Sequence, residues 1–197
     1  MNTLKHLNSL LVIAILFALS SCQTDVEHAD SLRLENKFDE AAQLYQKAAD
    51  EGDAYATWRL SIAYGNGDGV DFDQEKAFTL LKEAADKGCK EAECDLSWAY
   101  MFGWYGHTDS VKGKQMFDKL IAQDNDNAYI QSRYADLLLS GAEGLYEKNT
   151  EKALRILKQV KDKDDPYYLW VEGYIYASGI DTIEPDFSKA ITYFTKS

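Results

Sequence analysis

The feature of this sequence that most constrains its fold is an internal repeat with a period of 36 residues. The spacing is clearest between the first two copies, where small, aromatic and glycine residues recur in the same order: Ala41 and Ala77, Gly52 and Gly88, Leu60 and Leu96, Tyr64 and Tyr100, Gly67 and Gly103. Later copies keep the register, because Gly67, Gly103, Gly141 and Gly179 are separated by 36, 38 and 38 residues. A period of this length predicts an array of small supersecondary units, each packed on its neighbours.

Within each copy the apolar residues follow the periodicity of an α-helix. Ala56, Leu60, Ala63 and Tyr64 are spaced as one helical face, and a second such face follows the glycine-rich loop over residues 65–70. Each unit is therefore expected to be a pair of helices joined by a turn. The sequence predicts ten helices, near residues 27–36, 39–51, 54–65, 74–87, 90–102, 111–123, 127–140, 150–162, 166–178 and 187–197.

Two aspartates mark the starts of helices. Asp73 and Asp186 each stand three residues before a lysine and directly ahead of a helical segment, which is typical of an N-cap. The acidic loop over residues 66–75 could instead hold calcium, since this cation prefers several carboxylates in a short loop. Counted from Asp68 or Asp71, however, the loop lacks the glycine and the glutamate of the usual calcium-binding pattern. We therefore favour caps and turns, and we predict no metal and no cofactor.

These repeated residues resemble the Sel-1-like repeat, a longer-looped relative of the tetratricopeptide repeat. The resemblance is carried by Ala48, Ala49, Gly52, Ala56, Leu60, Ser61, Tyr64, Gly67, Gly69, Val70, Asp73, Lys76 and Ala77. It is strong over residues 39–103 and weaker afterwards, where Leu120 and Ile121 replace the alanine pair. The resemblance implies an all-α fold, a right-handed α-solenoid of about five stacked helix-turn-helix repeats over residues 27–197, with a concave inner face.

The N-terminus carries the pattern of an export signal. Lys5 precedes an apolar run of about ten residues, too short to span a bilayer of roughly 30 Å as a helix. Residues 19–22, Leu-Ser-Ser-Cys, resemble the bacterial lipobox, which implies cleavage after residue 21 and lipidation of Cys22. We expect a signal peptide over residues 1–21, a polar tether over residues 22–26 and a membrane-anchored lipoprotein of the bacterial cell envelope. By resemblance to sorting signals, Gln23 favours the outer membrane. The alternative is an ordinary secretory signal followed by a chance cysteine.

Charge and cysteine content narrow the possible partners. A formal net charge of −12 repels phosphate backbones and argues against a nucleic acid partner. Cys89 and Cys94 lie five residues apart in or beside one predicted helix, so their side chains point about 140° away from each other. This is poor geometry for a disulfide, and we predict two separate thiols.

Aromatic residues are the main clue to a binding surface, with 13 Tyr, 8 Phe and 4 Trp in the chain. The resemblance to tetratricopeptide units implies that certain positions of each first helix face the concave groove. The residues expected there are Tyr55, Trp58, Arg59, Ile62, Trp98, Tyr129, Arg133, Tyr167, Trp170 and Tyr174. Arg59 and Arg133 share one column of the repeat and could pair with an acidic or C-terminal group of a peptide.

Two alternatives concern these aromatic residues. The tryptophans Trp58, Trp98 and Trp170 would instead pack between neighbouring helices, as part of the core. Trp104 and Tyr105, in the loop after Gly103, are expected to be exposed and would form a second contact patch.

The sequence contains no recognisable set of catalytic residues. Outside the expected signal peptide the only imidazoles are His28 and His107, and neither has ligand spacing to a cysteine or carboxylate. We expect an adaptor or assembly scaffold that binds a protein or peptide in the envelope, not an enzyme. The alternative is a cell-wall-associated protein that hydrolyses β-lactams or binds peptidoglycan. Some cysteine-rich relatives are described as acting on β-lactams, but this chain lacks their paired cysteines and any Ser-x-x-Lys stretch.

Overall fold

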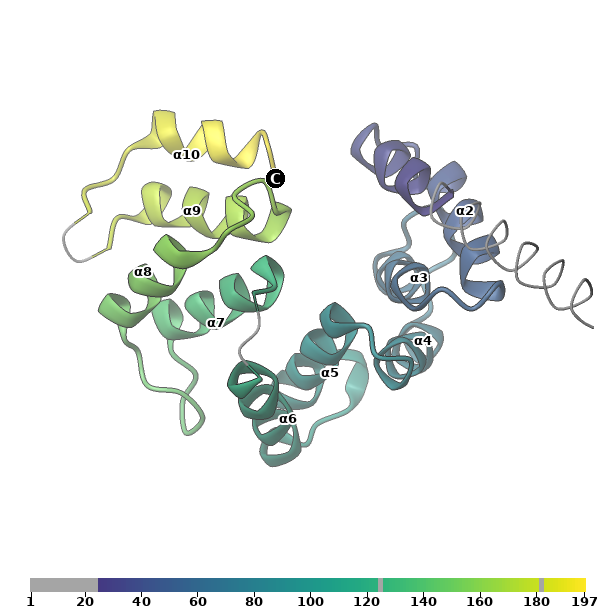
Figure 1. Ribbon diagram of the computed structural model, residues 1–197, viewed down its shortest axis with the longest axis horizontal. Helices are drawn as coiled ribbons and strands as arrows, with labels where there is room; N and C mark the ends of the chain where they lie inside the picture. Colours follow the sequence, from purple (N-terminus) through teal and green to yellow (C-terminus); the bar gives the residue numbers. More distant parts are fainter. Residues whose placement is uncertain (1–24, 124–125, 181–182) are drawn as a thin grey trace, which may run out of the picture. The chain divides into compact units, whose positions relative to one another are not determined.

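The computed structural model describes residues 25–123, 126–180 and 183–197. Over these residues the chain is a succession of helices (Figure 1): residues 25–34, α2 (Phe38–Asp50), α3 (Ala54–Asn66), α4 (Gln74–Asp86), α5 (Lys90–Phe102), the short 3-10 helix η1 (Trp104–Gly106), α6 (Ser110–Ala122), α7 (Ala128–Ser140), α8 (Thr150–Gln159), α9 (Pro166–Ser178) and α10 (Phe187–Phe194). The β-structure in the described part is limited to isolated bridges from Ala142 to Tyr146 and from Ile180 to Ile183. The predicted all-α solenoid is confirmed, and from the end of the first helix onward the helix boundaries differ from the sequence prediction by at most three residues.

The chain forms two compact units, one up to Leu96 and one from Ser97 onward, with the boundary inside α5. The core of the first unit contains Val26, Ala29, Leu32, Ala41, Tyr45, Ala48, Ala56 and Leu60. The core of the second contains Ala128, Ala135, Leu138, Leu139, Ala153, Leu157, Val160, Tyr168, Leu169, Val171 and Ile175. Both cores use the alanine and leucine columns of the repeat, so small side chains let paired helices approach closely.

The predicted polar tether over residues 22–26 is too long at its C-terminal end. Asp25 and Val26 already lie in the first helix. Both are held by the fold, since Lys47 Nζ donates to Asp25 Oδ2 at 2.6 Å and Val26 is buried in the first core. The rest of the tether and the predicted signal peptide, with Cys22, lie outside the described residues.

Short polar side chains cap the starts of most helices. Asp73 accepts a hydrogen bond from the backbone N–H of Lys76 at 2.9 Å, and Asp186 accepts one from Lys189 at 3.0 Å, so both predicted N-caps are confirmed. The same contact is made by further capping residues, namely Asp53, Asp109, Asn127, Asn149 and Asp165. Each cap satisfies a backbone N–H that would otherwise lack a partner at the helix start.

A second recurrent contact closes each long hairpin loop. The backbone N–H of the capping residue donates to a carbonyl near the end of the preceding helix, at 2.7 to 2.9 Å, in the pairs Asp73 and Tyr64, Asp109 and Tyr100, Asn149 and Leu138, and Asp186 and Tyr176. The lysine three residues after the cap then lies over the tyrosine ring, with Lys76 Nζ 3.9 Å from the Tyr64 centroid and Lys112 Nζ 4.0 Å from that of Tyr100. The repeated tyrosine and lysine columns are therefore structural.

Two glycines permit close backbone contacts that no other residue would allow. Gly69 has a φ of +71°, and a Cβ added there would lie 2.2 Å from the carbonyl oxygen of Phe38. Gly113 occupies, in α6, the column that Ala41 and Ala77 fill elsewhere, and a Cβ there would lie 2.5 Å from the carbonyl oxygen of Ser97. The loop after α3 thus lies directly against the start of α2, and α6 lies directly against α5.

Candidate partner-binding surface

The residues predicted to bind a partner lie on α3, α5, α7 and α9. They form one cluster in each compact unit, and each cluster is centred on an arginine. Arg59 is the centre in the first unit and Arg133 is the centre in the second.

Arg59 is held by one carboxylate and two aromatic rings. Its Nε lies 3.2 Å from Asp30 Oδ1 and donates to the hydroxyl of Tyr55 at 2.9 Å. The guanidinium carbon lies 5.0 Å from the ring centroid of Tyr55 and 4.7 Å from that of Trp58. Asp30 also accepts a hydrogen bond from Tyr45 at 2.6 Å. Burial raises the pKa of Tyr55 to about 12, so this hydroxyl remains protonated at neutral pH.

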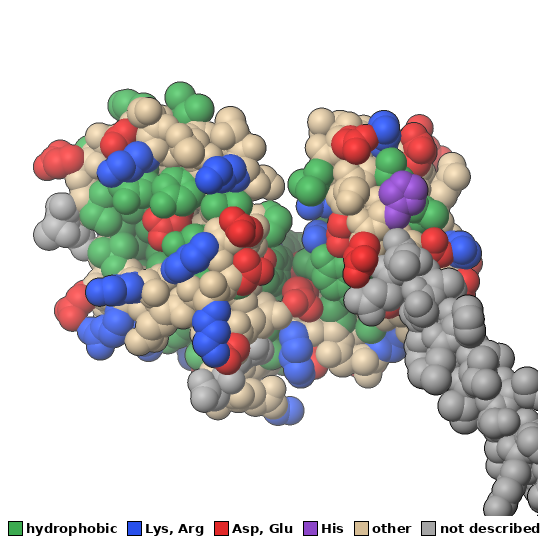
Figure 2. Space-filling model, turned by 45° about the horizontal axis from the view of Figure 1, so that its top comes forward, with side chains coloured by type: hydrophobic (Ala, Val, Ile, Leu, Met, Phe, Trp, Pro, Cys, Tyr) green, Lys and Arg blue, Asp and Glu red, His purple; other side chains and the backbone are tan. Residues whose placement is uncertain are grey.

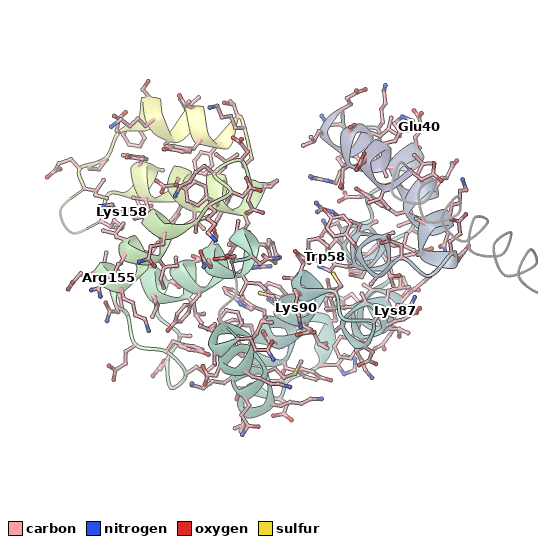
Figure 3. The ribbon with its side chains drawn as sticks, viewed as in Figure 1. Glu40, Trp58, Lys87, Lys90, Arg155 and Lys158 are labelled. Carbon is pink, nitrogen blue, oxygen red and sulfur yellow. The ribbon has the colours of Figure 1, made fainter. Side chains whose placement is uncertain are left out.

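Trp58 is part of the core and not of the surface. Only 3% of the residue is exposed, and its indole Nε1 donates to Asp95 Oδ2 at 2.8 Å. Figure 3 shows Trp58 on α3, and the hydrogen bond links this helix to α5. For Trp58 the structure favours the packing alternative. Ile62, one turn further along α3, is half-buried and lines a pocket.

Arg133 has a similar but more enclosed environment. Its Nη2 donates to Tyr129 Oη at 2.8 Å and its Nη1 donates to Tyr167 Oη at 3.2 Å. The guanidinium carbon lies 4.6 Å from the ring of Trp98 and 4.4 Å from that of Tyr167. Tyr167 donates in turn to Asp136 Oδ2 at 2.7 Å, while burial raises the pKa of Asp136. Because Arg133 is buried, it organises these rings and presents little of its own surface.

Trp98 and Trp104 cover this arginine from the side of α5 and η1. Trp98 is 8% exposed, and its ring centroid lies 5.9 Å from that of Trp104. Trp104 is exposed, as predicted, yet its ring also lies 5.4 Å from the Arg133 guanidinium carbon. Tyr105, which was also predicted to be exposed, is instead half-buried, with a φ of +58°. The loop aromatics and the Arg133 cluster are therefore one continuous group of rings.

The exposed part of the predicted surface is on α9. Trp170 and Tyr174 are 40% and 39% exposed, and their rings are stacked with centroids 5.9 Å apart and planes 12° apart. Tyr167 precedes them on the same helical face, 5.5 Å from Trp170. Trp170 thus lies at the surface, unlike the other two tryptophans of the prediction. Figure 2 shows hydrophobic side chains gathered on the C-terminal unit.

The sequence prediction missed the acidic members of the first cluster, Asp30 and Asp95. Asp30 lies before the first clear repeat, so the column alignment gave no signal for it. Asp95 could have been found, because it occupies the same column as Arg59 and Arg133. This column holds a charged residue in three successive repeats, and in the structure Asp95 accepts the indole N–H of Trp58 from the preceding repeat.

The remaining chemistry-bearing groups do not assemble into a recognisable site. Cys89 and Cys94 are buried thiols that are not joined to each other, as predicted. Residues 25–123, 126–180 and 183–197 contain no group of three or more side chains suited to hold a metal ion. None of the helices in the described part combines the length and hydropathy that a bilayer span requires.

Comparison with curated proteins gives two distant relatives. The chain is 25% identical over 150 residues to an exopolysaccharide production negative regulator of Rhizobium leguminosarum, covering 70% of this chain and 55% of that protein. It is 27% identical over 160 residues to an uncharacterised protein of Neisseria meningitidis serogroup B, covering 81% of this chain and 32% of that protein. The chain therefore spans about half or less of the length of these relatives.

Solved structures show the same fold at low sequence identity. A Sel1 repeat protein from Klebsiella pneumoniae matches with a TM-score of 0.61 at 22% identity, over 87% of this chain and 83% of the other. A Sel1 repeat protein from Oxalobacter formigenes gives a TM-score of 0.53 at 22% identity, over 87% and 68%. An immunity protein from Pseudomonas aeruginosa gives 0.55 at 18% identity, over 89% and 65%.

The family model of the Sel1 repeat matches five consecutive segments, at residues 32–53, 54–89, 90–125, 128–165 and 173–197. These matches cover most of the chain and agree with the helix pairs described above. The chain belongs to the Sel1 repeat family.

Proposed function

We propose that this protein is a lipid-anchored scaffold of the bacterial cell envelope. It binds a protein or peptide through aromatic residues on the first helix of each repeat. Sel1 repeat proteins generally act as scaffolds for protein–protein interactions and are typically not catalytic. The observation that carries the proposal is the exposed pair Trp170 and Tyr174 on α9. The ring of Trp170 packs on that of Tyr167, whose hydroxyl accepts a hydrogen bond from the buried Arg133.

Rigid, half-exposed aromatic rings favour binding for a physical reason. Trp and Tyr offer a large apolar area, and interface residues of these types carry much of the binding energy in known complexes. Here the neighbouring rings already restrict the side chains, so less conformational entropy is lost when a partner binds. The acidic surface of the chain favours a partner with neutral or basic flanking residues.

The first test is capture of partners from a bacterial envelope extract. Replacing both Trp170 and Tyr174 by alanine is expected to abolish capture, because each true anchor contributes about 2 kcal/mol or more to binding. Partners are identified by mass spectrometry after crosslinking. The matched control is Val111→Ala, since Val111 is an exposed apolar residue on α6, outside the cluster.

Three outcomes are informative. Loss of capture in the double variant alone supports the proposal. Equal capture by the wild type, the double variant and Val111→Ala would show that this surface is not the binding site. Sedimentation of the wild-type protein with purified peptidoglycan, removed by the same two substitutions, would assign the aromatic pair to a saccharide and favour the cell-wall alternative.

Membrane anchoring is tested separately, at Cys22. The Cys22→Ser variant is expected to lose incorporation of a labelled fatty acid and to move from the membrane fraction to the soluble fraction. Several buried acyl chains, each methylene worth about 0.8 kcal/mol, account for the retention expected of the wild type. Label retained by Cys22→Ser would refute the lipobox interpretation, whereas Cys89→Ser serves as the matched control because Cys89 is buried in the fold.

A further inference from the structure

A pocket in the first unit brings Arg33, which belongs to neither aromatic cluster, together with Arg59. It has a volume of about 110 Å³ and lies between the first helix, α2 and α3. Arg33 and Arg59 line it, and Ala41, Ala42 and Ile62 give it an apolar wall. Arg59 and Ile62 belong to the predicted binding residues, so the pocket adjoins the Arg59 cluster of the same unit.

Arg33 is the unusual member of this pocket. Its Nε is buried and has no hydrogen-bond partner, and within the described residues Arg33 forms no ion pair. A buried N–H without an acceptor costs free energy, since water is removed from the donor and nothing replaces it. Solvent does not reach this Nε, so an incoming acceptor would meet the terminal nitrogens of the Arg33 guanidinium, which have no hydrogen-bond partner among the described residues.

Arg59 also keeps donors available. Its Nε is used by Asp30 and Tyr55, whereas its two terminal nitrogens donate no hydrogen bond to the described part of the chain. Asp68 lines the same pocket, but its carboxylate accepts from Asn66 Nδ2 at 3.0 Å and pairs with neither arginine. The negative charges of Asp30 and Asp68 offset the positive charges of Arg33 and Arg59, so the pocket carries no excess positive charge. A ligand carboxylate would therefore be held by the directional N–H donors of the guanidiniums.

We infer that the Arg33 and Arg59 pocket binds the C-terminal residue of a partner polypeptide. The α-carboxylate accepts hydrogen bonds from the guanidiniums, and a small aliphatic side chain on the same residue covers Ala41, Ala42 and Ile62. An internal Asp or Glu brings a carboxylate but no separate apolar group, so it would leave this wall uncovered. The inference rests on the proposed role in peptide binding and names the part of the peptide that is recognised.

The test uses fluorescently labelled hexapeptides of one sequence, which end in valine with a free carboxylate or in valine amide. A third peptide is amidated and carries a glutamate at its second-last position. Anisotropy titrations are expected to give the tightest binding for the free carboxylate, with amidation weakening it by about tenfold or more, as for loss of a charge-assisted hydrogen bond. The Nε–Hε signals of Arg33 and Arg59 in ¹⁵N-edited NMR spectra are expected to shift only with the free carboxylate.

Variants separate this site from general effects on the fold. Arg33→Gln is expected to weaken binding of the free carboxylate about tenfold, and Arg33→Lys to weaken it less, because lysine keeps the charge but loses the planar fork. The control is Arg155→Gln, since Arg155 on α8 is exposed to solvent (Figure 3) and is expected to leave binding unchanged. Arg33→Gln removes no hydrogen bond to the described residues, so thermal unfolding should be unaffected.

Two results would overturn the inference. One is equal binding of the acid and amide peptides, or no binding of either. The other is equal or tighter binding of the amidated glutamate peptide, which would assign the pocket to an internal acidic side chain. If Arg33→Gln still captures the natural partner while the Trp170 and Tyr174 double variant does not, the proposed function stands and the inference about the pocket fails.

Discussion

Replacing Gly69 by alanine is expected to lower the free energy of unfolding of the first unit by about 3 kcal/mol or more. Part of this loss comes from the φ of +71°, which costs an L-residue about 1 to 2 kcal/mol. The larger part comes from contact of the new Cβ with backbone atoms of Phe38 and Asp39 at 2.2 to 2.6 Å, which forces the loop after α3 away from the start of α2. Urea denaturation followed by circular dichroism at 222 nm measures the change.

Gly88→Ala is the matched control for this substitution. Gly88 has a similar positive φ of +89°, but an added Cβ there meets nothing within 4 Å. Its expected cost is therefore the conformational part alone, about 1 to 2 kcal/mol. If the two variants lost equal stability, the close approach of the loop to Phe38 would not contribute to the fold.

Replacing Phe117 by alanine is expected to destabilise the second unit by about 3 to 5 kcal/mol. Phe117 is fully buried on α6 and lies between three other aromatic rings, with centroid distances of 6.4 Å to Trp98, 6.1 Å to Tyr134 and 6.2 Å to Tyr146. Removal of the ring leaves a cavity that these rigid neighbours fill poorly. Thermal and urea unfolding both report the loss, and near-ultraviolet circular dichroism reports the altered packing of the tyrosines and Trp98.

Phe187→Ala makes the same chemical change at an exposed site. Phe187 is the first residue of α10 and is 68% exposed, so its removal is expected to change stability by less than about 0.5 kcal/mol. A large loss in Phe187→Ala, or a small one in Phe117→Ala, would contradict the packing described for α6.

The helices could be predicted from the sequence because their signals are local. Asp73 and Asp186 mark helix starts, and the alanine and glycine columns mark where helices approach and turn. The prediction for α8 extended to residue 162, but the helix ends at Gln159. Residues 161–165 are all charged and offer no apolar face that could pack a further helical turn against the core. The end of α8 is therefore set by packing and not by helical propensity alone.

The candidate site could be predicted only in part, because burial depends on contacts between helices. The repeat columns gave the positions of Trp58, Trp98 and Trp170 but could not tell which of them is covered. Trp58 is covered because Asp95 accepts its indole N–H, and Trp98 because the Arg133 guanidinium lies on its ring. Within the described residues, the ring of Trp170 contacts the rings of Tyr167 and Tyr174 but no arginine or carboxylate. Trp170 therefore remains at the surface.

The hydrogen bonds that close each hairpin loop have a consequence for how this protein acquires its structure. Each bond joins residues near in sequence, such as Asp73 and Tyr64, and each following helix has its own capping residue. Chains dominated by such short-range contacts fold quickly, within roughly microseconds to milliseconds, because little loop entropy is lost before contacts form. Assembly can begin at any hairpin and spread to its neighbours, so the order of folding need not follow the order of synthesis.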